Sequence, residues 1–205
     1  CRRLPYADAR LCAALGLPER AGGRSLALLT CDQDDTLYAA LDHATKMADV
    51  EVIYAKSFYA GSAHASGPLS GEILGVLAAD EPESIEQAVR AVAFALEHLF
   101  AFYKVGDAGV TVFPTVIGSV GRYLAAQAGV APGTPFGYFI APPVEAVVGV
   151  DAALKAADVK LARFFGPPTE TNFAGAWVTG SLDAVEAAAR AFADAVADVA
   201  ATPLR

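Results

Sequence analysis

The stretch DHATKMADV at 42–50 returns 109 residues later as DAALKAADV at 151–159, with six of the nine positions identical. An apolar run precedes each copy, LALLTC at 26–31 in the first half and FGYFIAP at 136–142 in the second. A strand-like run follows each copy, EVIYA at 51–55 and KLARFF at 160–165. A period near half of the chain length is too long for a solenoid repeat and fits two domain-sized copies. The sequence therefore predicts an internally duplicated protein.

Composition narrows the classes of function. Hydrophobic residues make up 55% of the 205 residues and charged residues 19%, which favours extensive contact between subunits. An alanine-rich sequence is the plainer explanation of the same figures. The net charge of −8 argues against a nucleic-acid partner, which needs a basic face, and suits cationic or neutral small ligands.

Metal, cofactor and membrane signals are weak in the sequence. The three cysteines show no C-x-x-C spacing, and the three histidines do not pair at ligand spacing, so we expect no metal and no cofactor. The sparse cysteines favour a reducing compartment. The longest uncharged stretch, 123–144, contains four prolines and is not expected to be a membrane helix. No basic and apolar leader is visible, and the chain starts at Cys1 without a methionine.

Hydrophobic periodicity predicts the same order of elements in both halves. The elements expected in the first half are a helix at 7–15, a strand at 25–31, a helix at 38–48, a strand at 50–54, a loop at 56–71, a strand at 72–77 and a helix at 82–102. Those expected in the second half are a strand at 136–141, a helix at 145–157, strands at 159–164 and 173–179, and a helix at 182–200.

These elements predict an α+β fold in two tandem domains, each a sheet with helices on one side. The domains are placed at 1–108 and 109–205. The segment 105–134, where the halves meet, is expected to hold a strand and a short helix at 118–127.

The run LALLTCDQDDTLY at 26–38 resembles the first motif of haloacid-dehalogenase-type phosphotransferases. In that family the first acid, here Asp32, attacks phosphorus, and the second, here Asp34, acts as acid and base beside Mg²⁺. The motif also needs a downstream lysine and a second acidic pair, for which only Asp107 and 80–81 are candidates. The structural alternative is that Asp32, Asp34 and Asp35 cap amide groups between a strand and a helix.

The duplicated D-x-A-x-K-x-A-D-V pattern at 42–50 and 151–159 resembles the signature of bacterial microcompartment shell proteins. In that family a helix that carries a lysine precedes a strand, and the lysine lies at the edge of a flat hexagonal tile. The resemblance implies that Lys46 and Lys155 are edge lysines. The alternative is that each lysine is an ordinary solvent-exposed helix residue. Its occurrence at the same position in both copies argues against that alternative.

Longer runs narrow the resemblance. EVIYAKSFYAGSAH at 51–64, APPVEA at 141–146 and PPTETN at 167–172 look like the tandem-domain shell proteins of ethanolamine-utilising microcompartments. The resemblance covers nearly the whole chain from about residue 11 and is weakest over 80–120. It implies a homotrimer of circularly permuted shell domains that forms a pseudohexagonal disc, beside other shell proteins of a cytoplasmic microcompartment. It also implies that the protein is not an enzyme.

The resemblance further implies pores. Asp34 and Glu72 are expected to bind ethanolamine in a small pore within each subunit, where carboxylates offer charge-assisted hydrogen bonds to an ammonium group. Tyr59 and His64, in the loop 55–67, are candidates for the central channel. A soluble binding module for a small amine or a corrinoid stays open as an alternative to a shell protein.

Overall fold

The computed structural model describes residues 1–58, 73–107, 109–167 and 172–202. The chain divides into two compact units. Unit 1 comprises Cys1–Phe100 together with Gly121–Leu124, and unit 2 comprises Ala101–Val120 with Ala125–Arg205. The domain boundary expected after residue 108 stays a prediction.

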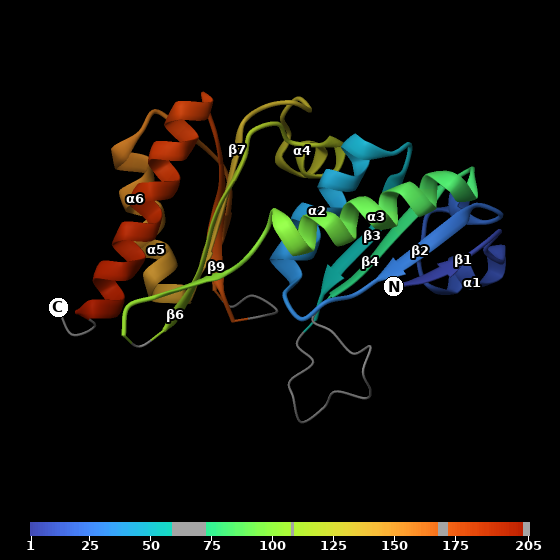
Figure 1. Ribbon diagram of the computed structural model, residues 1–205, viewed down its shortest axis with the longest axis horizontal. Helices are drawn as coiled ribbons and strands as arrows, with labels where there is room; N and C mark the ends of the chain where they lie inside the picture. Colours follow the sequence, from blue (N-terminus) through green and yellow to red (C-terminus); the bar gives the residue numbers. More distant parts are fainter. Residues whose placement is uncertain (59–72, 108, 168–171, 203–205) are drawn as a thin grey trace. The chain divides into compact units, whose positions relative to one another are not determined.

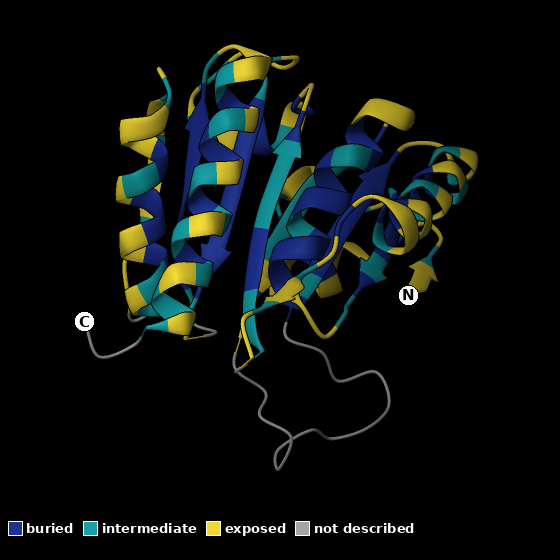
Figure 2. Cartoon of the chain, turned by 60° about the vertical axis from the view of Figure 1, so that its left-hand side comes forward, coloured by how far each residue is buried: buried dark blue, intermediate teal, exposed yellow. Residues whose placement is uncertain are grey.

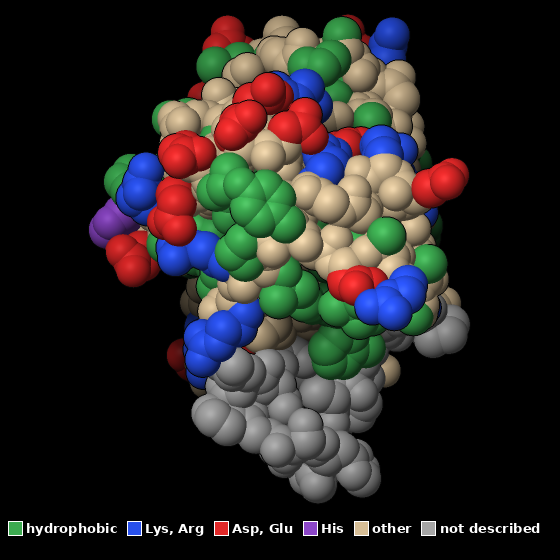
Figure 3. All heavy atoms as spheres, turned by 90° about the vertical axis from the view of Figure 1, so that its right-hand side faces the viewer, with side chains coloured by type: hydrophobic (Ala, Val, Ile, Leu, Met, Phe, Trp, Pro, Cys, Tyr) green, Lys and Arg blue, Asp and Glu red, His purple; other side chains and the backbone are tan. Residues whose placement is uncertain are grey.

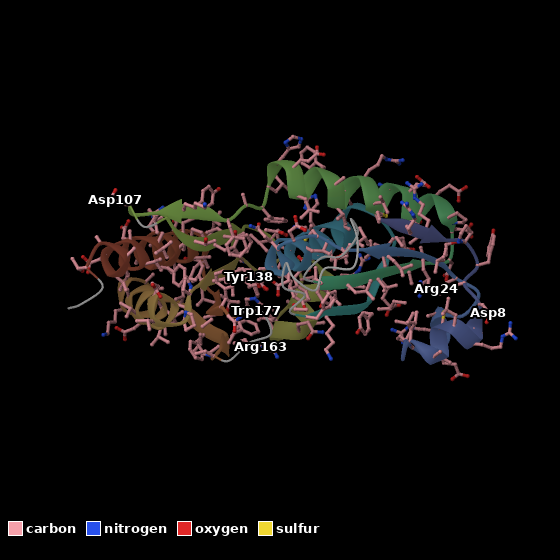
Figure 4. The ribbon with its side chains drawn as sticks, turned by 90° about the horizontal axis from the view of Figure 1, so that it is seen from below. Asp8, Arg24, Asp107, Tyr138, Arg163 and Trp177 are labelled. Carbon is pink, nitrogen blue, oxygen red and sulfur yellow. The ribbon has the colours of Figure 1, made fainter. Side chains whose placement is uncertain are left out.

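Unit 1 is built on a four-stranded antiparallel sheet of order β1-β2-β4-β3 (Figure 1). Its strands are β1 (Arg2–Leu4), β2 (Ser25–Leu29), β3 (Glu51–Ser57) and β4 (Ile73–Ala79). Its helices are α1 (Ala9–Ala14), the 3₁₀ turn η1 (Glu19–Ala21), α2 (Asp34–Met47) and α3 (Pro82–His98). At one end of the sheet, Arg24 forms ion pairs of 3.1 Å with Glu51 and 2.7 Å with Asp80 (Figure 4).

Unit 2 is built on a five-stranded sheet of order β5-β6-β7-β9-β8, again antiparallel throughout (Figure 1). Its strands are β5 (Tyr103–Val105), β6 (Val110–Ile117), β7 (Phe136–Ala141), β8 (Lys160–Phe165) and β9 (Ala174–Thr179). The helices are α4 (Arg122–Ala128), whose first turn belongs to unit 1, α5 (Pro143–Ala156) and α6 (Leu182–Ala201). Within the described residues, no helix is long and apolar enough to cross a membrane.

The two sheets repeat each other in detail. The order β1-β2-β4-β3 corresponds to β6-β7-β9-β8, with β5 added at the edge of the second sheet. The register of β3 against β4 shifts between Val52 and Tyr54, and that of β8 against β9 shifts between Leu161 and Arg163. These two irregularities lie 109 residues apart, the same offset as the sequence motif. A local irregularity at an equivalent place is strong support for an internal duplication.

The core of unit 2 lies between its sheet and the pair α5 and α6. Phe192 of α6 stacks on Phe139 of β7 with ring centroids 5.1 Å apart, and both rings are fully buried. Gly149 of α5 faces Phe192 so closely that a Cβ there would lie 2.7 Å from the ring. Figure 2 shows the buried stripes of these helices toward the sheet and exposed residues on their outer faces. This is the sheet with helices on one side that the periodicity predicts.

Unit 1 differs from that expectation because helical segments cover both faces of its sheet. Contacts with β2, β3 and β4 place α2 and α3 on one face. On the other face, Cys12 of α1 and Ala21 of η1 pack with Leu26 and Val76 in one apolar cluster. The expectation of helices on one side is therefore wrong for unit 1. The apolar residues of α1 and η1 are few and closely followed by Gly22 and Gly23, so their periodicity carried little signal.

Several element boundaries also differ from expectation. Helix α2 begins at Asp34 and not at 38, because two carboxylates in its first turn suit the positive end of the helix. Helix α3 ends at His98 and not at 102, since the amides of Leu99 and Phe100 both donate to the Ala95 carbonyl. The three-residue strands β1 and β5 were not expected, because so short a strand has no readable period.

The face of the unit 2 sheet away from α5 and α6 is aromatic. Tyr138 and Trp177 lie edge to face with centroids 5.5 Å apart, and the Arg163 guanidinium lies 5.6 Å from the Trp177 ring (Figure 4). The buried Trp177 indole N–H has no hydrogen-bond partner among the described residues. Alternation along β7 and β9 thus gives this sheet an aliphatic face beneath the helices and an aromatic face opposite.

Candidate functional site

The candidate site lies where β2 passes into α2. Asp34 and Asp35 are the first residues of α2 and are buried, as is Thr36 after them. The helix cap is Gln33, whose side chain makes no capping bond. Asp34 and Asp35 therefore belong to the first helical turn, where carboxylates suit the positive end of the helix. Asp32, before the cap, is exposed.

Backbone and side-chain hydrogen bonds fix this turn. The Gln33 carbonyl accepts from the Thr36 hydroxyl at 2.7 Å and from the Cys31 thiol at 2.9 Å. One turn further on, the Tyr38 hydroxyl is hydrogen-bonded to Ser57 Oγ at 2.9 Å and accepts the Ser57 N–H at 3.0 Å. The start of α2 is thus tied to the end of β3.

The site disfavours additional negative charge. Burial is the main cause that raises the pKa of the Tyr38 hydroxyl, and the charges of Asp34 and Asp35 raise it further. Burial likewise raises the pKa of the Cys31 thiol, with added contributions from Asp32 and Asp34. Both groups therefore stay neutral at pH 7. Such a place suits a small cation that carries a hydroxyl.

The other predicted pore residues lie outside the described part of the chain. These are Glu72 for the small pore and Tyr59 and His64 for the central channel. Within the described ranges, no group of three or more His, Cys, Asp or Glu side chains could hold a metal ion.

The two predicted edge lysines occupy the last turns of α2 and α5, where a cation suits the negative end of a helix. Lys155 is exposed and lies 2.6 Å from Asp151 one turn earlier. Lys46 is also exposed, but partial burial lowers the pKa of its ammonium group, against the opposing effect of Asp42. The repeat therefore places the two lysines at equivalent positions in different surroundings.

Asp42 is a structural residue that the sequence reasoning missed. It is fully buried, and its carboxylate accepts the N–H of Gly121 at 2.6 Å and of Leu124 at 2.8 Å. The neighbouring Thr45 hydroxyl accepts the Arg122 N–H at 3.0 Å. Burial raises the pKa of Asp42, and its backbone hydrogen bonds oppose that shift. The repeated Asp of the motif was the available signal, but nothing in it distinguished a buried cap from an exposed acid.

Comparisons with known proteins agree with this architecture, although no protein-family model matches the chain. The chain is 46% identical over 182 residues to bacterial microcompartment shell protein EutL of Clostridium perfringens, a match that covers 88% of this chain and 84% of that protein. A crystal structure of ethanolamine utilization protein EutL from Leptotrichia buccalis has a TM-score of 0.92 and 44% identity. That match covers 100% of this chain and 94% of the other.

A more distant structure shares the fold. The crystal structure of PduB, a trimeric bacterial microcompartment shell protein, has a TM-score of 0.77 at 20% identity and covers 96% of this chain and 86% of its own. The resemblance to tandem shell proteins and the predicted α+β class are thereby confirmed. With close to half of its residues identical over most of its length, this chain belongs to the EutL family of bacterial microcompartment shell proteins.

Proposed function

We propose that the protein is a structural, non-enzymatic tile of a microcompartment shell, assembled as a homotrimer. The observation that carries the proposal is the repeat in the fold: both units have the same strand order and the same register shift. Three chains then supply six similar modules, which is the number needed to form a pseudohexagonal ring. In this proposal the protein lies in the microcompartment shell, next to other shell proteins.

Exposed apolar side chains support assembly. The large hydrophobic residues with exposed side chains include Tyr6, Leu11, Leu15, Phe94, Val144, Val147, Val148, Leu161 and Phe164. Apolar surface on this scale is typical of subunits that bury it against partners. Light scattering coupled to size exclusion is expected to give three times the chain mass of 21.1 kDa. A monomer at high concentration would contradict the proposal.

Variants of the two predicted edge lysines test whether trimers assemble side by side into extended layers. Lys46→Glu combined with Lys155→Glu should leave trimers intact and abolish extended layers in negative-stain micrographs. Lys104→Glu, an exposed lysine on β5, is the matched control and should leave layers unchanged. Layers that persist in the double variant would show that these lysines do not join tiles.

We further propose that a pore within each subunit admits ethanolamine, the small molecule in the printed name of the Leptotrichia buccalis relative. Asp34 supports this, because it is a buried carboxylate at a site whose neighbours Tyr38 and Cys31 both stay neutral. Glu72 is proposed as the second acid, and Tyr59 and His64 as central-channel residues. A pore should bind its cargo weakly enough to release it.

Calorimetry tests the pore. Asp34→Asn and Glu72→Gln should each weaken ethanolamine binding, and the double variant should abolish it. The exposed neighbour Asp32→Asn is the control and should bind as the wild type does. Propanol, which keeps the hydroxyl and lacks the ammonium, should not bind. Unchanged affinity in Asp34→Asn would remove this residue from the pore.

A further inference from the structure

Two hydrogen-bond donors on the aromatic face of the unit 2 sheet have no acceptor among the described residues. The first is the indole N–H of Trp177, a residue that is 5% exposed and whose N–H is buried without a partner. The second is the guanidinium group of Arg163, which is exposed and forms no ion pair or hydrogen bond within the described ranges. Buried donors without an acceptor are rare in folded proteins, so the pair needs an explanation.

The register of the sheet makes the two donors neighbours. Arg163 of β8 is paired directly with Trp177 of β9, so both side chains lie on the same face. The central carbon of the guanidinium lies 5.6 Å from the centroid of the Trp177 ring and 5.0 Å from that of Phe165. Figure 4 shows Arg163, Trp177 and Tyr138 in one region of unit 2. One acceptor can therefore meet both donors.

The sheet itself contains no acid that could be this acceptor. None of the strands β5 to β9 includes an Asp or a Glu. The rings of Phe136, Tyr138 and Phe165 surround Trp177 at centroid distances of 4.9–5.6 Å. Elsewhere in the chain basic side chains have acidic neighbours, as many of those on the face in Figure 3 do. An arginine among aromatic rings is thus an exception in a chain with 23 acids and 15 lysines and arginines.

The internal repeat shows that the fold does not require these donors. The matching register shifts of the two sheets align Arg163 with Tyr54, and the strand partners of these residues align Trp177 with Val76. In unit 1, Val76 is buried in an apolar cluster, against which Tyr54 packs. An aliphatic side chain is therefore sufficient at the position of Trp177. The guanidinium and the indole N–H are additions of the second copy, which favours a binding role.

We propose that Arg163 and Trp177 bind a small monocarboxylate. The planar fork of the guanidinium takes both carboxylate oxygens, and the indole N–H donates to one of them. The single charge of the guanidinium matches a monocarboxylate better than a phosphate dianion in a chain of net charge −8. Because Arg163 is exposed, its side chain can turn away from the Trp177 ring and bring the anion to the N–H. This site is independent of the proposed ethanolamine pore.

The composition of the chain provides a direct probe of the site. Trp177 is the only tryptophan, so ¹⁵N-labelled protein gives a single indole N–H resonance. Titration with sodium acetate at constant ionic strength should move this resonance downfield to a plateau, because the carboxylate accepts the N–H. Acetamide has nearly the same shape without the charge and should move it little. A resonance that stays in place with acetate, or that moves equally with acetamide, would overturn the proposal.

Variants test the role of each donor. Arg163→Gln should weaken acetate binding by about tenfold or more, and Arg163→Lys, which keeps the charge and loses the fork, should lie between it and the wild type. Lys160→Gln, at an exposed lysine of the same strand, removes the same charge and should bind as the wild type does. Far-UV circular dichroism should be unchanged in all three. An equal loss of affinity in Arg163→Gln and Lys160→Gln would show a general effect of charge and overturn the site.

The indole N–H needs a measurement that does not use tryptophan. Line broadening of ¹³C-labelled acetate reports binding to Trp177→Phe, which keeps a ring and removes the donor. This variant should bind acetate about fivefold more weakly than the wild type. Unchanged affinity would remove the N–H from the site. Competition by phosphate at lower concentrations than acetate would overturn the assignment of the ligand as a monocarboxylate.

Discussion

At the scale of single residues, the duplicated motif shows that identity of sequence does not fix a role. Asp42 and Asp151 occupy the same position of the repeat, yet the first is a buried acceptor of two backbone N–H groups and the second an exposed partner of Lys155. A buried carboxylate is stable only where such donors meet it. The environment of each Asp is set by residues far away in the sequence.

Gly121 is the residue on which that buried contact depends. A Cβ there would clash with the Asp42 carbonyl and lie 2.6 Å from Thr45 Oγ1. Gly121→Ala should lower the free energy of unfolding by about 1–3 kcal/mol, as overpacking does. Gly118→Ala is the control, because its Cβ would meet only Leu182 at 3.9 Å, and it should be neutral. Urea unfolding measures both, and equal stability of the two variants would contradict the close approach.

The ionisation of Asp42 should be visible in the pH dependence of stability. Its pKa in the folded protein is raised above the ordinary 3.8, so the folded state binds more protons than the unfolded state just above that value. The stabilisation from its bound proton is present below 3.8 and is lost as the pH rises through the folded pKa. The difference in unfolding free energy, wild type minus Asp42→Asn, should therefore decrease from acid to neutral pH.

An exposed acid of the same motif provides the control for that measurement. Asp49→Asn removes one carboxylate from the surface at the end of the same motif and leaves the buried Asp42 in place. Urea titrations at a series of pH values give both curves. If the unfolding free energy of the wild type instead increases relative to that of Asp42→Asn as the pH rises, the hydrogen bonds from Gly121 and Leu124 lower the pKa of Asp42 by more than burial raises it.

Residue roles were predictable from sequence only in part. Asp34 was singled out on resemblance, and the structure does place it buried at the start of a helix. Whether it binds ethanolamine stays a prediction. Asp42 could not have been assigned, because the amides it accepts lie 79 and 82 positions away. Contacts at that separation leave no trace in local periodicity.

At the scale of elements, prediction succeeded where burial is periodic. Strand β7 was placed at its observed bounds of 136–141, and β9, α5 and α6 within two residues, because each is long and packs one clear face. The observed start of α2 at Asp34 and end of α3 at His98 differ from the predicted residues, because the helix dipole and hydrogen bonds set where these helices begin and end. The side on which α1 packs was beyond reach, since it depends on tertiary burial of Cys12.

The close packing of α5 on α6 gives an element-scale prediction. A Cβ at Gly149 would lie 2.7–2.8 Å from the Phe192 ring and 3.2 Å from its carbonyl oxygen. Gly149→Ala should lower the free energy of unfolding by about 1–3 kcal/mol. Phe192→Leu alone should lower the free energy of unfolding. In that background Gly149→Ala should be less destabilising than in the wild type, because the ring that the new Cβ would meet is absent. A double-mutant cycle by urea unfolding measures that coupling, and strict additivity would show that the two helices adjust freely.

At the scale of the whole molecule, many large apolar side chains are exposed although each unit has a buried core. Gly121–Leu124 packs on α2 within unit 1, through the hydrogen bonds to Asp42. The exposed apolar residues include Leu11 on α1 and Val144, Val148 and Leu154 on α5. These exposed apolar residues account in part for the low fraction of charged residues that favoured assembly in the sequence analysis.

Assembly through such surfaces should make thermal stability depend on protein concentration. If folded chains form the proposed trimer and unfolded chains do not, mass action raises Tm as concentration increases. Scanning calorimetry over a hundredfold range of concentration should show a steady rise in Tm for the wild type. A wild-type Tm that does not move, in a sample that is trimeric by light scattering, would mean that the chains unfold before they separate and that the subunit contact adds no stability to either unit.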